Sequence, residues 1–198
     1  MDILRTLLIF AHLLIFSFAI TNLFRSDIKL FSTRIPPSQL KKLGDQMKLL
    51  LFALALTGAG IVYIDTQFNL AATLGADKLM AKMVCVGVLV INALVLHSVV
   101  FQKMKKNTLS HSEMALMMVS GAISTCSWTF AGFLGIAKAL SHYFLLSHFL
   151  YLYGSCLLVA IIVALILVPT VRRNWQIANV RMPQGVQSND IEASAVKF

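Results

Sequence analysis

Charged residues are scarce in this chain, and their scarcity points to a membrane protein. Only 13% of the 198 residues are Asp, Glu, Lys or Arg, whereas a soluble domain usually carries about 25%. Hydrophobic residues make up 58% of the chain, and the mean hydropathy is +0.80. A surface with so few charges does not stay hydrated, so we predict that lipid surrounds a single helical bundle.

The chain also lacks the patterns of common enzymes and metal sites. No P-loop, GxSxG, HExxH or GxGxxG motif is present. Cys85, Cys126 and Cys156 fall in apolar runs without CxxC or zinc spacing, so we interpret them as packing residues. No Asp or Glu is expected deep in a span. This argues against a proton-driven transporter, which commonly uses an embedded carboxylate.

Five apolar runs are long enough to cross a bilayer as helices, which takes about 20 residues each. They cover about 3–24, 47–64, 79–101, 114–134 and 143–168. Transmembrane β-strands would be about half as long and would alternate apolar with polar residues. We therefore predict an all-α, polytopic transmembrane bundle of about five spans over 1–173, followed by a disordered tail over 174–198.

Prolines are expected to end helices at two places. Pro36 and Pro37 lie in the first loop and should break any helix there. Ser38 is then placed to cap a short helix that leads into the second span. Pro169 follows the last apolar run and is expected to close the fifth helix.

Lys and Arg are distributed unevenly between the two ends of the predicted bundle. The loops after the first and third spans, together with the tail, hold thirteen of them. The other side holds four: Arg5, Lys78, Lys82 and Lys138. Because basic residues near spans stay in the cytoplasm, we predict an inner (plasma) membrane protein with its N-terminus outside and its C-terminus inside. The net charge of +9 then reflects topology and contact with anionic lipid, and no nucleic-acid partner is expected.

The first run also resembles a signal peptide, with Ser17-Phe18-Ala19 as a cleavage site. Cleavage there would leave the strongly basic first loop outside, against the charge rule. We therefore interpret the run as a retained helix.

Polar side chains within the spans are the candidate functional residues, because an ionisable group in hydrocarbon is costly. We single out His12, His97 and His148 as candidate cofactor ligands, and His12 and His148 also as candidate metal ligands. The other candidates are Asn92, Lys82, Ser124, Trp128 and Tyr151. The alternative is structural: the histidines and Asn92 form hydrogen bonds between helices, and Lys82 extends to the outer interface.

Depth in the membrane separates the three histidines. Helical rise places His12 about 13 Å, His148 about 8 Å and His97 about 27 Å from the outer end of their spans. A haem held by two histidines needs both at a similar depth. The depths therefore favour haem b between the first and fifth helices, on His12 and His148.

Small residues line two of the predicted helices. Ser120, Ser124, Ser127, Ala131 and Gly135 share one face of the fourth, and Thr57-Gly58-Ala59-Gly60 lies in the second. They suit close helix packing, and on the fourth helix also a wall against which a flat cofactor or a substrate lies. Asp65, at the outer end of the second helix, is expected to pair with Lys78 or Lys82.

Short motifs occur in roughly the first 100 residues. They are Phe10-Ala11-His12-Leu13-Leu14, Leu43-Gly44-Asp45, Thr57-Gly58, Lys82-Met83-Val84-Cys85 and Ile91-Asn92-Ala93-Leu94-Val95-Leu96-His97. With these motifs the chain resembles small bacterial membrane proteins of the copper-resistance D and membrane protoporphyrinogen oxidase type. The resemblance implies haem, porphyrin or copper handling, with His12 and His97 as the residues carried over.

Three functional hypotheses follow. The first is an inner-membrane protein that binds haem or a related cofactor for redox chemistry or cofactor handling. The second is a non-catalytic subunit or assembly factor that packs on other membrane subunits or forms a homo-oligomer. The third is a metal or small-solute permease. No catalytic residue is assigned from the sequence.

Overall fold

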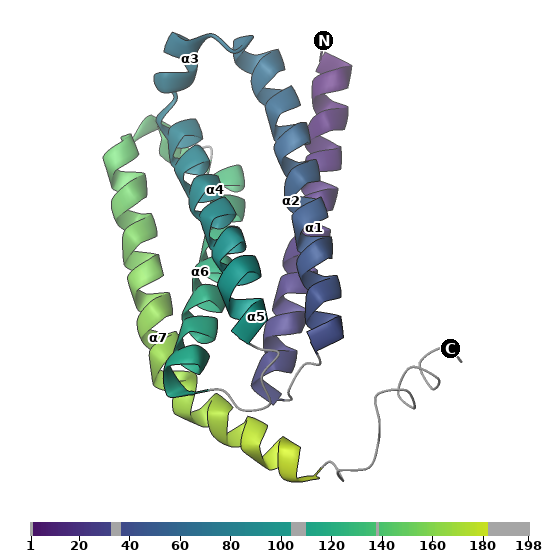
Figure 1. Ribbon diagram of the computed structural model, residues 1–198. Coiled ribbons are helices and arrows are strands. Elements are labelled where there is room, and N and C mark those ends of the chain that lie inside the picture. Colours follow the sequence, from purple (N-terminus) through teal and green to yellow (C-terminus); the bar gives the residue numbers. More distant parts are fainter. Residues whose placement is uncertain (1, 33–36, 104–109, 138, 182–198) are drawn as a thin grey trace, which may run out of the picture.

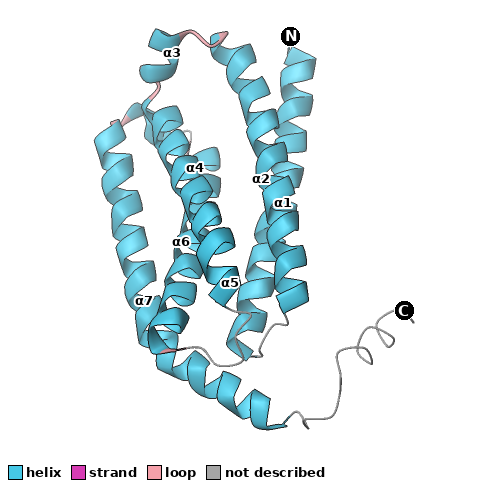
Figure 2. Cartoon of the chain, in the orientation of Figure 1, coloured by secondary structure: helices cyan, strands magenta, loops and turns pink. Residues whose placement is uncertain are grey.

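The structure, a computed structural model, describes residues 2–32, 37–103, 110–137 and 139–181. In these ranges every regular element is helical (Figures 1 and 2). The elements are α1 (Asp2–Ser32), α2 (Pro37–Thr66), α3 (Leu70–Leu74), α4 (Asp77–Val95), the π-helix η1 (Leu96–Val100), α5 (Phe101–Lys103), α6 (His111–Ile136), the 3₁₀-helix η2 (Ala139–His142) and α7 (Leu146–Arg181). The all-α prediction is confirmed.

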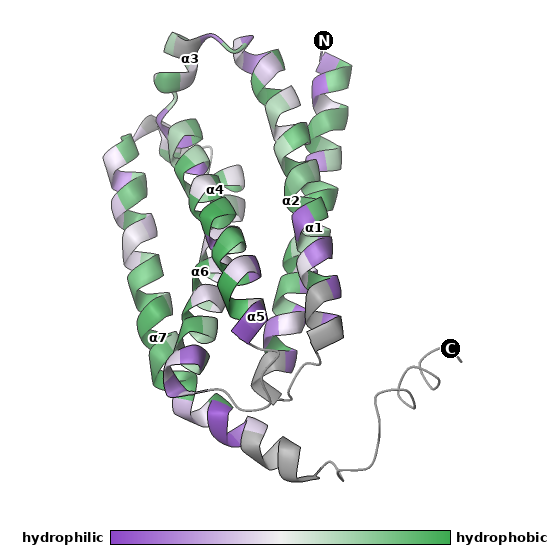
Figure 3. Cartoon of the chain, in the orientation of Figure 1, coloured by the Kyte–Doolittle hydropathy of each residue, from purple (hydrophilic) through white to green (hydrophobic). Residues whose placement is uncertain are grey.

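Five of these helices are long and apolar enough to cross a membrane. The spans are Asp2–Lys29, Lys42–Thr66, Asp77–Val100, His111–Ile136 and Leu146–Trp175. Apolar residues run along most of their length (Figure 3). Many large apolar side chains point outward, among them Phe10 and Ile166. A soluble protein would not expose so many, so these faces contact the lipid bilayer, and the predicted number of spans is confirmed.

The helices extend further than the apolar runs. α1 ends at Ser32 rather than near Phe24, and α2 begins at Pro37 rather than near Met47. The predicted ends were wrong because hydropathy marks the part of a helix that lies in lipid. Polar residues such as Lys and Gln still favour helix beyond it. Pro37 suits a first helical position, where its missing N–H is not needed. Pro36 lies outside the described residues.

The prediction that Pro169 closes the last helix was also wrong. Pro169 lies inside α7, which continues to Arg181, so 174–181 are helical and not part of a disordered tail. An internal proline removes one hydrogen bond and bends a helix without having to end it. Figure 1 shows α7 changing direction towards its C-terminal end. Val171 and Trp175 are buried and hold this last part against the bundle. Residues 182–198 lie outside the described part.

Three apolar clusters hold the bundle together. At the end where α6 begins, which we call the basic end because the Lys- and Arg-rich segments lie there, Val100 and Met114 pack against Val168, Val171 and Trp175 of α7. At the opposite end, α4, α6 and α7 meet around buried residues that include Cys85, Phe130, Leu134, Phe149 and Tyr153. Between them, Ala19, Leu23 and Leu54 pack on Leu89 and Trp128. This third cluster joins α1 and α2 to α4 and α6.

α1 and α2 form an antiparallel hairpin with a regular contact line. Arg5 and His12, seven residues apart on α1, contact Asp65 and Thr57 on α2. Between these contacts Leu8 packs on Gly60, where an added Cβ would lie 3.3 Å from the leucine side chain. The spacings of three and four along α1 are those of coiled-coil packing. The close approach expected at Thr57-Gly58-Ala59-Gly60 is confirmed.

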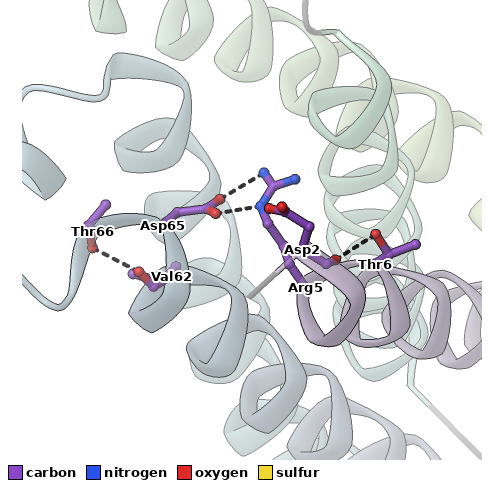
Figure 4. A network of polar contacts seen from close by, with 6 residues as sticks. All are labelled: Asp2, Arg5, Thr6, Val62, Asp65 and Thr66. Atoms are coloured by element: carbon purple, nitrogen blue, oxygen red, sulfur yellow. Dashed lines mark hydrogen bonds and ion pairs between the residues drawn. The ribbon is translucent and has the colours of Figure 1, made fainter.

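The hairpin also decides the partner of Asp65. The Arg5 guanidinium donates to the Asp65 carboxylate from Nε at 2.6 Å and from a terminal nitrogen at 3.1 Å (Figure 4). The expected pairing with Lys78 or Lys82 was wrong, because the antiparallel register brings the start of α1 beside the end of α2. Both side chains are largely exposed, so the pair adds little stability.

Candidate intramembrane site

The three span histidines have three different surroundings. On α1, His12 lies with Nδ1 2.8 Å from the Thr57 hydroxyl oxygen, and that hydroxyl donates to the Ala53 carbonyl at 2.9 Å. The Thr57 hydroxyl therefore lies between the imidazole of α1 and the backbone of its own helix. The structural interpretation of His12 as a link between helices therefore matches the contact that it makes. Lys82 lies on α4 and is half-buried.

His97 and His148 lie elsewhere. His97 belongs to η1, contacts the Lys48 ammonium group and lies 3.7 Å from the Asp45 carboxylate. His148 is exposed and accepts a hydrogen bond from the backbone N–H of Leu145 at 3.3 Å, close to the start of α7. Each contact ties a histidine to a different part of the bundle. Among the described residues no group of three or more His, Cys, Asp and Glu is placed to hold a metal ion.

Asn92 and Tyr151, two of the predicted polar residues, lie in different surroundings: one between helices and one on the outside of the bundle. The buried Asn92 amide donates to the Ser120 carbonyl at 2.9 Å, a hydrogen bond between α4 and α6 that matches its structural interpretation. Tyr151 is 78% exposed on the outside of α7. On the small-residue face of α6, Ser127 is buried, with its hydroxyl 2.6 Å from that of Tyr153. Part of that face therefore packs closely against α7.

A cavity of about 140 Å³ lies between α1, α2, α6 and the end of α4 with η1. Its wall is mostly apolar and includes Trp128, which is 4% exposed. The polar residues on it are Ser26, Asp27, Lys48, His97 and Ser124. The structure thus brings together the predicted residues His97, Ser124 and Trp128. The volume is below the roughly 300–1,000 Å³ of drug-sized sites, so the cavity suits a small molecule or the head group of a larger one.

Asp27 is the residue of this site that the sequence analysis missed. It lies on α1 and accepts a hydrogen bond from the Thr125 hydroxyl at 2.5 Å. Thr125 is about 21 Å along α6 from His111, near the middle of that span. Asp27 itself lies two residues before the end of the span Asp2–Lys29, so the expectation that no Asp or Glu lies deep in a span stays a prediction. Arg25 and Lys29 made this segment look like a loop.

One signal could have identified Asp27. Phe16 and Leu23 precede it by eleven and four residues, which places all three on one face of a helix. Phe16 and Leu23 both pack in the cluster that contains Trp128 of α6. A carboxylate that continues an apolar, inward-pointing face faces protein rather than water.

Asp27 has no cationic partner within the part of the chain that the structure describes. The ion pairs there join Arg5 to Asp65, and Lys48 and His97 to Asp45. Ionisable groups inside a membrane usually pair with one another or line a water-filled or ligand-binding path. Among the described residues the Thr125 hydroxyl is the partner of Asp27, and the carboxylate lies on the cavity wall.

Comparison with protein-family models, with curated protein sequences and with solved structures finds no match to this chain. The fold and the lipid-facing surfaces define the class: a multi-pass helical membrane protein. The resemblance to the copper-resistance D and protoporphyrinogen oxidase type stays a prediction, as do haem binding and membership of a larger complex.

Proposed function

We propose that the protein is a small-solute permease of the inner membrane, with Asp27 as the group that takes up a cation or a proton inside the bundle. The single observation that carries this proposal is the Asp27 carboxylate, which lies on the cavity wall and has no cationic partner among the described residues. Asp27 supports a transporter because it places a carboxylate on a cavity wall inside the bundle.

The energetics of a partly buried carboxylate favour this role. A fully desolvated ion costs several kcal/mol even after the protein relaxes around it, and partial burial imposes part of that cost; one hydroxyl donor offsets about 1.5–3 kcal/mol. Binding of a cation or a proton to Asp27 removes the remaining desolvation cost, and release of that ligand restores the cost. A group of this kind binds its ligand reversibly, as transport requires.

The other polar groups of the cavity support the same role. In the predicted orientation Lys48 and His97 lie towards the cytoplasm, where they line the cavity beside Asp45. His97 lies in the π-helix η1, an irregularity that is often found at functional sites. The cavity therefore has a carboxylate on one wall and a charged cluster towards the basic end.

Cysteine accessibility tests the proposal. In a Cys126→Ala/Cys156→Ala background, which leaves the buried Cys85, Ser124→Cys places a thiol on the cavity wall. Ser17→Cys is the matched control, because Ser17 is exposed on the outer side of α1 and bonds only to its own helix, at the Leu13 carbonyl. Vesicles of both orientations are treated with a charged, membrane-impermeant methanethiosulfonate.

A permease cavity opens to each side in turn, so Ser124→Cys should react from both faces of the membrane, while Ser17→Cys, in lipid, should react from neither. Reaction of Ser124→Cys from one face alone, or from neither, would overturn the permease proposal.

A further inference from the structure

A second, larger hollow lies on the outside of the bundle. It is a groove of about 850 Å³ between α6 and α7, with an almost entirely apolar surface. Along α7 it extends from Leu152 to Leu167, about 22 Å at helical rise. Its α6 wall contains small residues such as Ala122 and Cys126. In a membrane this groove faces the hydrocarbon chains of the lipid.

The groove and the cavity share part of their walls. Asp27 and Gly121 line both, and Thr125, which holds the Asp27 carboxylate, lines the groove. A Cβ added at Gly121 would meet no atom within 4 Å, so open space lies beside that residue. The carboxylate is therefore reached from the lipid side as well as from the cavity.

We propose, on the basis of the permease function above, that the ligand is a single-chain cationic amphiphile that enters from the bilayer. Its alkyl chain lies in the α6–α7 groove, and its ammonium group binds the Asp27 carboxylate. Charge complementarity selects the head group, because Asp27 is an acceptor without a cation among the described residues. The apolar groove that begins at this carboxylate favours a ligand with an alkyl chain. Only the cavity and the groove together call for a ligand that has both an ammonium group and an alkyl chain.

Tryptophan fluorescence can follow this ligand. The chain has two tryptophans, so Trp175→Phe leaves Trp128, on the cavity wall, as the only one. The full chain is placed in nanodiscs with a long-chain amine that carries a nitroxide near its polar end. The matched probe is the carboxylic acid with the same chain and label. A water-soluble nitroxide amine without a chain is the third probe.

The amine should quench Trp128 saturably, at a mole fraction at least about tenfold lower than the acid, because only the amine is attracted to Asp27. Asp27→Asn should remove this difference. Ala160→Phe, which fills the groove, should also remove it, whereas the same substitution at Ala55, exposed on α2, should leave it unchanged.

Three results would overturn the inference. The first is equal quenching by amine and acid, and the second is saturable amine quenching that Ala160→Phe does not change. The third is quenching by the amine only after a dimer dissociates, which would mean that a second copy of the chain occupies the groove. If the water-soluble amine alone quenches in an Asp27-dependent manner, the permease proposal stands and entry from lipid is wrong. If no amine quenches, cation binding at Asp27 fails in both proposals.

Discussion

The hydrogen bond between Thr125 and Asp27 should be among the strongest side-chain contacts between α1 and α6. Its length of 2.5 Å is at the short end for a hydroxyl that donates to a carboxylate, about 2.5–2.7 Å. Hydrogen bonds to charged groups contribute about 1.5–3 kcal/mol, whereas neutral ones between membrane helices average about 0.6 kcal/mol. Thr125→Val removes the donor, keeps the shape and leaves the carboxylate unsatisfied. We expect a loss of about 2 kcal/mol in unfolding free energy.

A double-mutant cycle separates this contact from packing. Replacing both partners by apolar side chains of similar size removes the unsatisfied group, so Thr125→Val should cost less than about 0.5 kcal/mol in the Asp27→Leu background. The assay is reversible unfolding of the full chain in mixed micelles, with sodium dodecyl sulfate as denaturant and circular dichroism as readout. Thr125→Ser, which keeps the hydroxyl, is the control. Equal costs of Thr125→Val in the two backgrounds would refute the reasoning.

Two further predictions concern helix packing and the cofactor. A Cβ at Gly132 would lie 2.6 Å from the Phe16 ring, while one at Gly135 would meet nothing within 4 Å. Gly132→Ala should therefore unfold more easily than Gly135→Ala by about 1–3 kcal/mol in the same assay, and equal stability would mean that Phe16 does not pack there. A haem on His12 and His148 requires a Soret band that His12→Ala abolishes. Protein purified with full haem supply and lacking that band would exclude the haem hypothesis without affecting Asp27.

The sequence predicts the architecture well because lipid imposes a simple rule on composition. Long apolar runs identify all five spans, and the polar Asn92 was correctly interpreted as a possible link between helices. Helix ends were predicted poorly, because charged residues such as Lys29 and Lys42 lie outside the apolar runs but still belong to the helices. Hydropathy therefore describes the environment of a helix better than its length.

The candidate site was harder to predict, because its members come from four helices. His97, Ser124 and Trp128 were identified individually, but their common cavity depends on how α4 and α6 pack against the hairpin. Asp27 was missed because its charged neighbours in sequence, Arg25 and Lys29, suggested a loop. Its partner, Thr125, is 98 residues away, and no local pattern connects them.

The contact line between α1 and α2 has a mechanical consequence. Arg5 with Asp65 and His12 with Thr57 fasten the hairpin at two levels, so sliding one helix along the other by a turn would break both contacts at once. α4, α6 and α7 are held together by their own buried clusters at each end. A motion that opens the cavity would therefore meet least resistance as a rocking of two helices, moving as one lever, against the other three. Its fulcrum would be the cluster around Ala19, Leu89 and Trp128.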